Sequence, residues 1–176
     1  PSTRYILFVA NNPETNPYKD LKSLIKGWKS ANQKLGKKGV DLLVVGSANS
    51  SVMKIDGQTL HYLSKKSSEE ISALMKKSLF VVHPSKQDNA PLTILEAHDS
   101  GKRVVASLVG GIPEMLDLNE RSWLFEVNDQ LGLCNSLIEA TNFADQHPDS
   151  FTESAPFSVE TMTDMYLGHY HDLLHG

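Results

Sequence analysis

Two carboxylates with a helix start between them are the feature of this chain best suited to chemistry. Asp88 and Glu96 stand eight positions apart, and Asn89 and Pro91 are typical of the first residues of a helix. The first N–H groups of a helix have no partner within it and lie at the positive end of its dipole, so they can bind a phosphate. A carboxylate can accept hydrogen bonds from neighbouring hydroxyls. The pattern therefore predicts a site for a sugar joined to a phosphate.

The anion-binding part is predicted at the start of this helix. Asn89 is expected to cap the helix, and Ala90 and Pro91 lie in its first turn. The N–H groups of Leu92 and Thr93 then have no carbonyl partner and are free for an anion.

The two carboxylates are expected to bind neutral groups, because two negative charges beside a diphosphate would repel it. A hexose hydroxyl is the expected partner of Asp88, and a ribose diol is that of Glu96. For either residue alone, a plain helix with an ordinary cap and an exposed Glu is the alternative interpretation.

Short apolar runs and helical patterns alternate along the chain, and they predict the fold. Strand-like runs occur at residues 5–10, 40–46, 79–83 and 103–106, with weaker candidates at 59–63 and 122–126. They lack clean alternation, which indicates strands buried on both faces. Helices are predicted at 19–35, from Ser67 onward, and at 91–100, 129–143 and 159–174. This order favours an α/β fold, a Rossmann-like doubly wound parallel sheet with helices on both faces. Ligands of such sheets bind beyond the carboxyl ends of the strands.

Two further polar features follow predicted strands. Lys19 stands at the start of a helix, where a cation opposes the helix dipole, so a bound anion explains it better than helix stability does. Gly110 and Gly111 permit a tight turn and close backbone approach. His83 ends a buried strand and is expected to be a core histidine with satisfied ring nitrogens. No metal site is expected, because His169, His171 and His175 lack a completing carboxylate.

Bulk composition fits one globular domain over residues 1–176. Apolar residues make up 40% and charged residues 22% of the chain. The net charge of −4 argues against a dedicated nucleic-acid binder. The single cysteine, Cys134, rules out an internal disulfide and fits a reducing, cytoplasmic compartment. The chain begins at Pro1 without Met, and we expect it to be one domain cut from a longer protein.

Residues 84–114 resemble the signature of family 4 retaining glycosyltransferases of the GT-B fold. The matching features are Pro84-Ser85, a carboxylate at Asp88, seven residues, Glu96-Ala97, a strand, and Gly110-Gly111-Ile112-Pro113-Glu114. The resemblance covers nearly the whole chain and matches the C-terminal, donor-binding half of such enzymes. The N-terminal domain, which would bind the acceptor, is not matched.

The resemblance implies roles for individual residues. In the family, the second Glu holds the ribose of the nucleotide and corresponds to Glu96. The first Glu contacts the donor sugar and is replaced here by Asp88. The N–H groups of Leu92 and Thr93 would bind the diphosphate, together with Lys19. The family's usual Arg after the first strand is missing, and Asn11 is nearest to its position. The loop at Gly110 and Gly111 would line the donor cleft.

The expected function is donor binding for retaining, metal-independent transfer of a hexose, as in polysaccharide biosynthesis. The acceptor would be a saccharide or a lipid-linked sugar, no cofactor would be needed, and the isolated domain is expected to be inactive. The exposed lysines Lys22, Lys26 and Lys29 could attract anionic lipids at the inner membrane face. One alternative is a non-catalytic module that binds a nucleotide sugar. Another is a hydrolase with Asp88 and Glu96 as an acid–base pair, which needs carboxyls roughly 5–9.5 Å apart.

Overall fold

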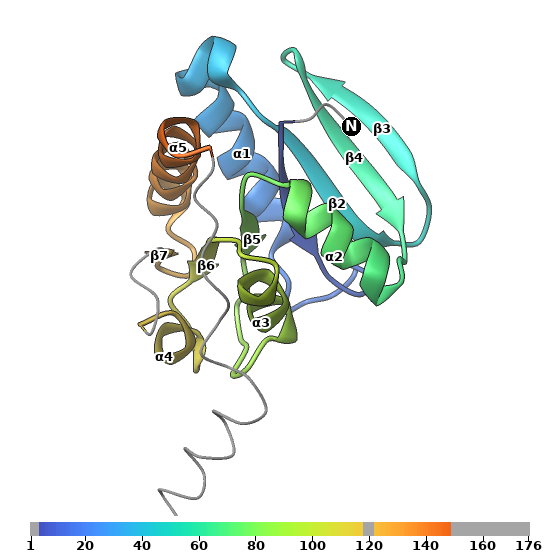
Figure 1. Ribbon diagram of the computed structural model, residues 1–176. Helices are drawn as coiled ribbons and strands as arrows, with labels where there is room; N and C mark the ends of the chain where they lie inside the picture. Colours follow the sequence, from blue (N-terminus) through green and yellow to red (C-terminus); the bar gives the residue numbers. More distant parts are fainter. Residues whose placement is uncertain (1–3, 118–121, 149–176) are drawn as a thin grey trace, which may run out of the picture.

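The computed structural model describes residues 4–117 and 122–148, which form a three-layer α/β domain (Figure 1). Seven strands make one sheet in the order β3-β4-β2-β1-β5-β6-β7. Every neighbouring pair is parallel except β3 and β4. The strands are β1 (Tyr5–Val9), β2 (Asp41–Ser47), β3 (Ser51–Ile55), β4 (Gln58–Ser64), β5 (Val81–His83), β6 (Val104–Ser107) and β7 (Trp123–Phe125). The predicted Rossmann-like sheet is confirmed, including its two weaker strands, β4 and β7.

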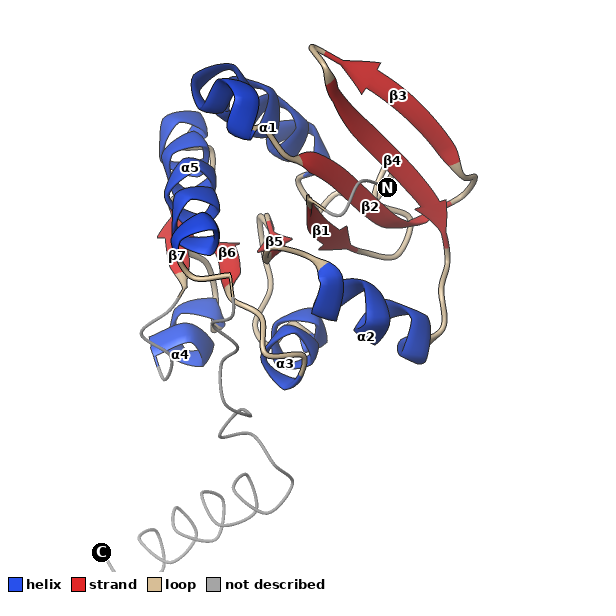
Figure 2. Ribbon diagram, turned by 45° about the horizontal axis from the view of Figure 1, so that its top comes forward, coloured by secondary structure: helices blue, strands red, loops and turns tan. Residues whose placement is uncertain are grey.

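Helices cover both faces of the sheet, as the alternation of strands and helices predicts (Figure 2). On one face, α1 (Leu21–Leu35) packs against α5 (Gln130–Gln146). On the other face lie α2 (Ser68–Lys77), α3 (Leu92–Asp99) and α4 (Ile112–Asp117). A short 3₁₀ helix, Gly36–Lys38, follows α1. The helix predicted at residues 159–174 lies outside the described residues.

The central strands are apolar throughout because each of their faces meets a helical layer. In β1, Ile6 and Phe8 belong to the core beneath α1 and α5, whereas Leu7 belongs to the core beneath α2, α3 and α4. In β2, Leu42 and Leu43 divide between the two cores in the same way. The lack of alternation in the sequence therefore correctly indicated strands buried on both faces.

The edge strand β3 was not predicted from the sequence. It pairs antiparallel with β4 through a hairpin whose turn residues Asp56 and Gly57 have φ values of 50° and 88°. Two successive positive φ angles are typical of the turn that Asp-Gly favours between antiparallel strands. All of β3 except Ile55 is exposed, so its apolar residues give no burial pattern. The Asp-Gly pair was the available signal.

Candidate functional site

Three loops meet at the carboxyl edge of the sheet, where the sequence predicted the ligand site. The loop after β1 and the loop after β5 pair through an antiparallel bridge between Lys19 and Ser85. The N–H of Lys86 donates to the carbonyl of Tyr18 at 2.8 Å. The N–H of Ser85 donates to the hydroxyl of Ser107, at the end of β6, also at 2.8 Å. These bonds fix the three loops relative to one another around Lys19, His83 and Asp88.

Lys19, Asp88 and His83 form a compact triangle within this arrangement. The ammonium of Lys19 lies 2.5 Å from Oδ2 of Asp88. Nε2 of His83 lies 3.1 Å from the same oxygen and 3.1 Å from Nζ of Lys19. The side chains of Lys19 and Asp88 are 17% and 20% exposed, whereas that of His83 is fully buried. The ion pair of Lys19 and Asp88 is therefore partly exposed at the site, and the imidazole of His83 contacts it from the core.

Burial and the neighbouring charges shift the pKa values of His83 and Asp88. Burial, together with the nearby charge of Lys19, lowers the pKa of His83 from 6.5 to about 4, so the ring is neutral near neutral pH. Burial alone would raise the pKa of Asp88. The hydrogen bond and charge of Lys19, assisted by His83, outweigh burial and hold the pKa of Asp88 below its usual value. Asp88 is therefore a carboxylate near neutral pH.

The loop after β6 packs directly on the backbone beside Asp88. Gly110 has φ +56°, and a Cβ there would stand 2.1 Å from the carbonyl oxygen of Asp88. A Cβ on Gly111 would stand 2.2 Å from the carbonyl oxygen of Asn89. Real Cβ atoms do not approach backbone oxygens this closely, so this packing requires both glycines.

The start of α3 differs from the prediction in one respect. Its N-cap is Pro91, without a side-chain cap, and not Asn89. The backbone of Asn89 packs against Gly111 instead, which moves the first helical residue to Leu92. Ala90, between Asn89 and Pro91, is exposed. Within the described part of the chain, no acceptor meets the N–H groups of Leu92 and Thr93. The N–H groups that were predicted to bind an anion thus lack an acceptor, although the cap is different.

Glu96 lies in a different setting from Asp88. It lines a hollow of about 200 Å³ between α2 and α3, together with Ser68, Ser72 and Asp99. Partial desolvation, and then repulsion from Asp99, raises the pKa of Glu96 above its ordinary value. Asp88 does not line this hollow. The two carboxylates thus belong to separate surroundings on either side of the first turn of α3.

Asn11 is not brought into the triangle. It is exposed after β1, and its carbonyl accepts a hydrogen bond of 3.4 Å from Nδ2 of Asn16. The structure thus brings together Asp88, Lys19, Asn89, Gly110 and Gly111, beside the N–H groups of Leu92 and Thr93.

Sequence reasoning missed two features of the site. His83 is buried as expected, but its Nδ1 has no partner among the described residues, so the prediction of a satisfied core histidine was wrong. Its position one residue before a polar loop was the available signal. In addition, Lys22 and Lys86 line a hollow of about 420 Å³ beside Lys19, whose lining also includes the carboxylates of Glu14 and Asp20.

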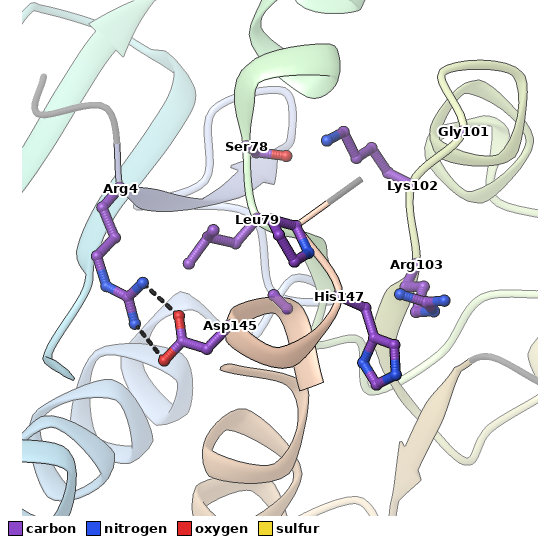
Figure 3. Close-up of a pocket in the computed structure, with 10 residues that line it drawn as sticks. Arg4, Ser78, Leu79, Gly101, Lys102, Arg103, Asp145 and His147 are labelled. Atoms are coloured by element: carbon purple, nitrogen blue, oxygen red, sulfur yellow. Dashed lines mark hydrogen bonds and ion pairs between the residues drawn. The ribbon is translucent and has the colours of Figure 1, made fainter. Parts of the chain in front are cut away.

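A hollow of about 240 Å³ lies at the opposite, amino-terminal edge of the sheet (Figure 3). Its lining includes Lys102 and Arg103, just before β6, and an ion pair between Arg4 and Asp145 with hydrogen bonds of 2.5 and 3.1 Å. None of the residues singled out from the sequence lines it. It is therefore separate from the candidate site.

Residues 4–117 and 122–148 contain no cluster of three or more His, Cys, Asp or Glu side chains arranged for a metal ion. Across the same residues, no helix has the length and apolar character to cross a membrane.

Comparison with known proteins supplies independent information. The family model for glycosyl transferases group 1 matches residues 3–142. The uncharacterized glycosyltransferase MJ1178 of Methanocaldococcus jannaschii is 29% identical over 91 residues, which are 52% of this chain and 26% of that protein. The chain thus spans about a quarter of the length of this relative.

Two solved structures share the fold. The chain resembles WaaG, a glycosyltransferase involved in lipopolysaccharide biosynthesis, with a TM-score of 0.60 and 19% identity over 81% of this chain and 39% of that one. It also resembles a chain of the GtfA/B complex, with a TM-score of 0.58 and 14% identity over 84% of this chain and 33% of that one. At these identities the similarity shows the fold alone.

Proposed function

Because the chain belongs to the family of group 1 glycosyltransferases, we propose that it is a donor-binding domain for a nucleoside-diphosphate sugar. One observation carries this proposal. The ion pair of Lys19 and Asp88 stands at the carboxyl edge of the sheet, next to the loop that leads into the uncapped start of α3. A cation, free N–H groups and a carboxylate at one edge suit a ligand that is a diphosphate at one point and a polyol at the next.

Each part of the donor has a candidate partner. The diphosphate binds the N–H groups of Leu92 and Thr93 and the ammonium of Lys19. A hydroxyl of the hexose donates to Asp88. The ribose enters the hollow between α2 and α3, where Glu96 accepts from its diol. The loop at Gly110 and Gly111 packs on the backbone of Asp88 and Asn89 and would line the donor cleft beside the sugar.

The reaction that follows is transfer of a hexose with retention of configuration. The bond between the anomeric carbon and the diphosphate oxygen breaks, and negative charge develops on the departing nucleoside diphosphate. An acceptor hydroxyl oxygen bonds to the same face of the anomeric carbon, and its proton passes to the departing diphosphate. The α3 N–H groups and Lys19 stabilise that charge, so no metal and no separate cofactor is needed. The acceptor, a saccharide or lipid-linked sugar as in polysaccharide biosynthesis, binds on a further domain of a longer cytoplasmic protein. This chain alone therefore binds the donor and transfers little.

A non-catalytic module that binds a nucleotide sugar is the second candidate. It is favoured by the shorter Asp88 where the family has Glu, and by Asn11 where the family has Arg. Transfer by the full-length protein separates this candidate from the enzyme. The hydrolase hypothesis is weakened, because Asp88 is paired with Lys19 while Glu96 lines another hollow.

Peripheral contact with the inner face of a membrane is a further part of the proposal. Lys22, Lys26 and Lys29 are exposed along one side of α1. Anionic lipids attract such a basic stripe. Sedimentation with vesicles of anionic lipid is expected to exceed that with neutral vesicles, and charge reversal at these three lysines should abolish the difference. Equal sedimentation of the unaltered protein with both vesicles would remove this part.

Calorimetry tests donor binding. Titrations of the full-length protein with UDP, ADP and GDP, and with UDP-glucose, ADP-glucose and GDP-mannose, identify the donor pair. Glu96→Ala should weaken binding of the preferred pair about tenfold through loss of the ribose hydrogen bonds. Glu139→Ala, an exposed change on α5, is the matched control and should bind normally. Equal binding by the Glu96 variant, or no binding by the unaltered protein, contradicts the assignment.

A further inference from the structure

The imidazole of His83 is a buried titratable group that the proposed function leaves unused. It ends β5, is 0% exposed, and has Nε2 within 3.1 Å of both Lys19 and Asp88. Its other nitrogen, Nδ1, is buried without a partner among the described residues. A buried imidazole with one nitrogen in contact with Lys19 and Asp88 is a candidate for a role in the same site.

The chemistry of the three groups determines which way the proton on His83 points. The ammonium of Lys19 can only donate, and the carboxylate of Asp88 can only accept. Nε2 of a neutral ring can donate to Asp88 or accept from Lys19, but not both. If it accepts, the proton resides on Nδ1 and leaves a buried N–H without a partner, which is rarer in proteins than an unpaired acceptor. The arrangement therefore favours an Nε2–H group that donates to Asp88.

The two partners of Asp88 differ in freedom. Lys19 ends a long, flexible side chain that is 17% exposed at the site, whereas the His83 ring is enclosed in the core. A bound diphosphate would compete with Asp88 for the N–H groups of Lys19. The ring of His83 would not be drawn away in the same manner.

We propose that His83 is a positioning residue, whose Nε2–H holds Oδ2 of Asp88 in place when Lys19 turns to the diphosphate of the donor. Oδ1 of Asp88, which no donor in the described part of the chain reaches, then accepts from the sugar. In the absence of donor, Lys19 and Asp88 neutralise each other. This inference rests on the proposed function and extends it from the groups that touch the donor to the group behind them.

Two substitutions separate positioning from simple packing. His83→Phe keeps a buried ring but removes the donor, and His83→Gln retains an N–H that can reach Asp88. In the full-length protein, His83→Phe should weaken binding of the preferred nucleotide sugar about tenfold, while binding of the matching nucleoside diphosphate stays within about twofold. His83→Gln should recover most of the loss. A purely structural role would weaken both ligands together and would overturn the proposal, as would unchanged binding of both.

A double-mutant cycle identifies Asp88 as the partner. In the Asp88→Ala background, His83→Phe should have no further effect on binding of the nucleotide sugar. Additive losses would show that His83 acts elsewhere and would overturn the proposal.

The tautomer provides a test without any ligand. The ¹⁵N chemical shifts of His83 should report a neutral ring protonated on Nε2. An Nδ1–H tautomer would overturn the inference and leave donor binding standing. Failure of the unaltered protein to bind any nucleotide would instead reject the proposed function, and with it the role of His83.

Discussion

Gly110 packs so closely on Asp88 that a single methyl group cannot be placed between them. An added Cβ would lie 2.1 Å from the carbonyl oxygen of Asp88 and 2.8 Å from Oδ1 of Asn89. The loop after β6 thus holds the backbone that carries the carboxylate. The glycine has a structural reason at this position that is independent of any ligand.

Gly110→Ala should therefore lower the free energy of unfolding by more than the strain of a positive φ angle alone would. Gly57 in the hairpin turn is a suitable control, because its φ of +88° is also positive and nothing lies within 4 Å of its Cβ position. Gly57→Ala should lower the free energy of unfolding by about 1–2 kcal/mol. Gly110→Ala should lower it by a further 1–3 kcal/mol, roughly the cost of overpacking. Urea denaturation measures both, and equal losses would contradict the close packing.

Lys19 should contribute to binding of phosphate rather than of nucleoside. Lys19→Ala removes a charge-assisted hydrogen bond and should raise the Kd for the preferred nucleoside diphosphate about tenfold to a hundredfold. Binding of the corresponding nucleoside, measured by the same titration, should change little. Lys34→Ala, an exposed lysine in the last turn of α1, is the control. If the two variants bind the diphosphate alike, Lys19 has no special role.

The partnership of Lys19 and Asp88 illustrates what the sequence can and cannot predict. Each residue follows a buried strand, so its place at the carboxyl edge was foreseeable from the pattern alone. Their contact joins positions 69 residues apart and depends on β1 lying next to β5 in the sheet. Strand order is a tertiary property that periodicity does not contain. The sequence therefore predicted both members of the pair but not the pair itself.

His83 and β3 were misjudged or missed for different physical reasons. Burial of His83 followed from its apolar strand, but the missing partner of Nδ1 depends on side chains from elsewhere in the fold. The strand β3 is an exposed edge, where neither burial nor alternation marks the backbone pairing. The shift of the α3 cap from Asn89 to Pro91 has a similar cause, because tertiary packing on Gly111 overrides a local preference.

The hollow between α2 and α3 should be needed for nucleotide binding. Ser72 lines it beside Glu96, and the hollow measures about 200 Å³. Ser72→Trp would fill it and should weaken binding of the preferred nucleoside diphosphate at least about tenfold, since the ribose would lose its hydrogen bonds. Lys76→Trp, exposed further along α2, is the control for adding an indole to this helix. Unchanged binding by the Ser72 variant would show that the ribose does not bind in this hollow.

Stability should fall on mild acidification because of His83. Its pKa is about 4 in the folded protein, against 6.5 for an ordinary histidine. Between these values the unfolded chain takes up a proton that the folded protein does not, so the free energy of unfolding decreases as the pH falls. The contribution of His83 to the free energy of unfolding is fully present above its pKa in the unfolded chain. This contribution decreases as the pH falls toward its pKa in the folded protein. The complete loss is about 3 kcal/mol, of which about 2 kcal/mol appears by about pH 5.

His83→Phe isolates this contribution, because phenylalanine does not titrate. Burial also lowers the pKa of His61 and His98, and both remain in the variant, so their share of the slope cancels in the comparison. Urea denaturation from about pH 7.5 to about pH 5 should show that the unaltered protein loses about 2 kcal/mol more of its free energy of unfolding than the variant does. Parallel curves would mean that the folded protein accepts a proton on His83 as readily as the unfolded chain. The ring would then titrate beside Lys19 as it does in the unfolded chain, and the neutral ring assigned here would not be maintained at mildly acidic pH.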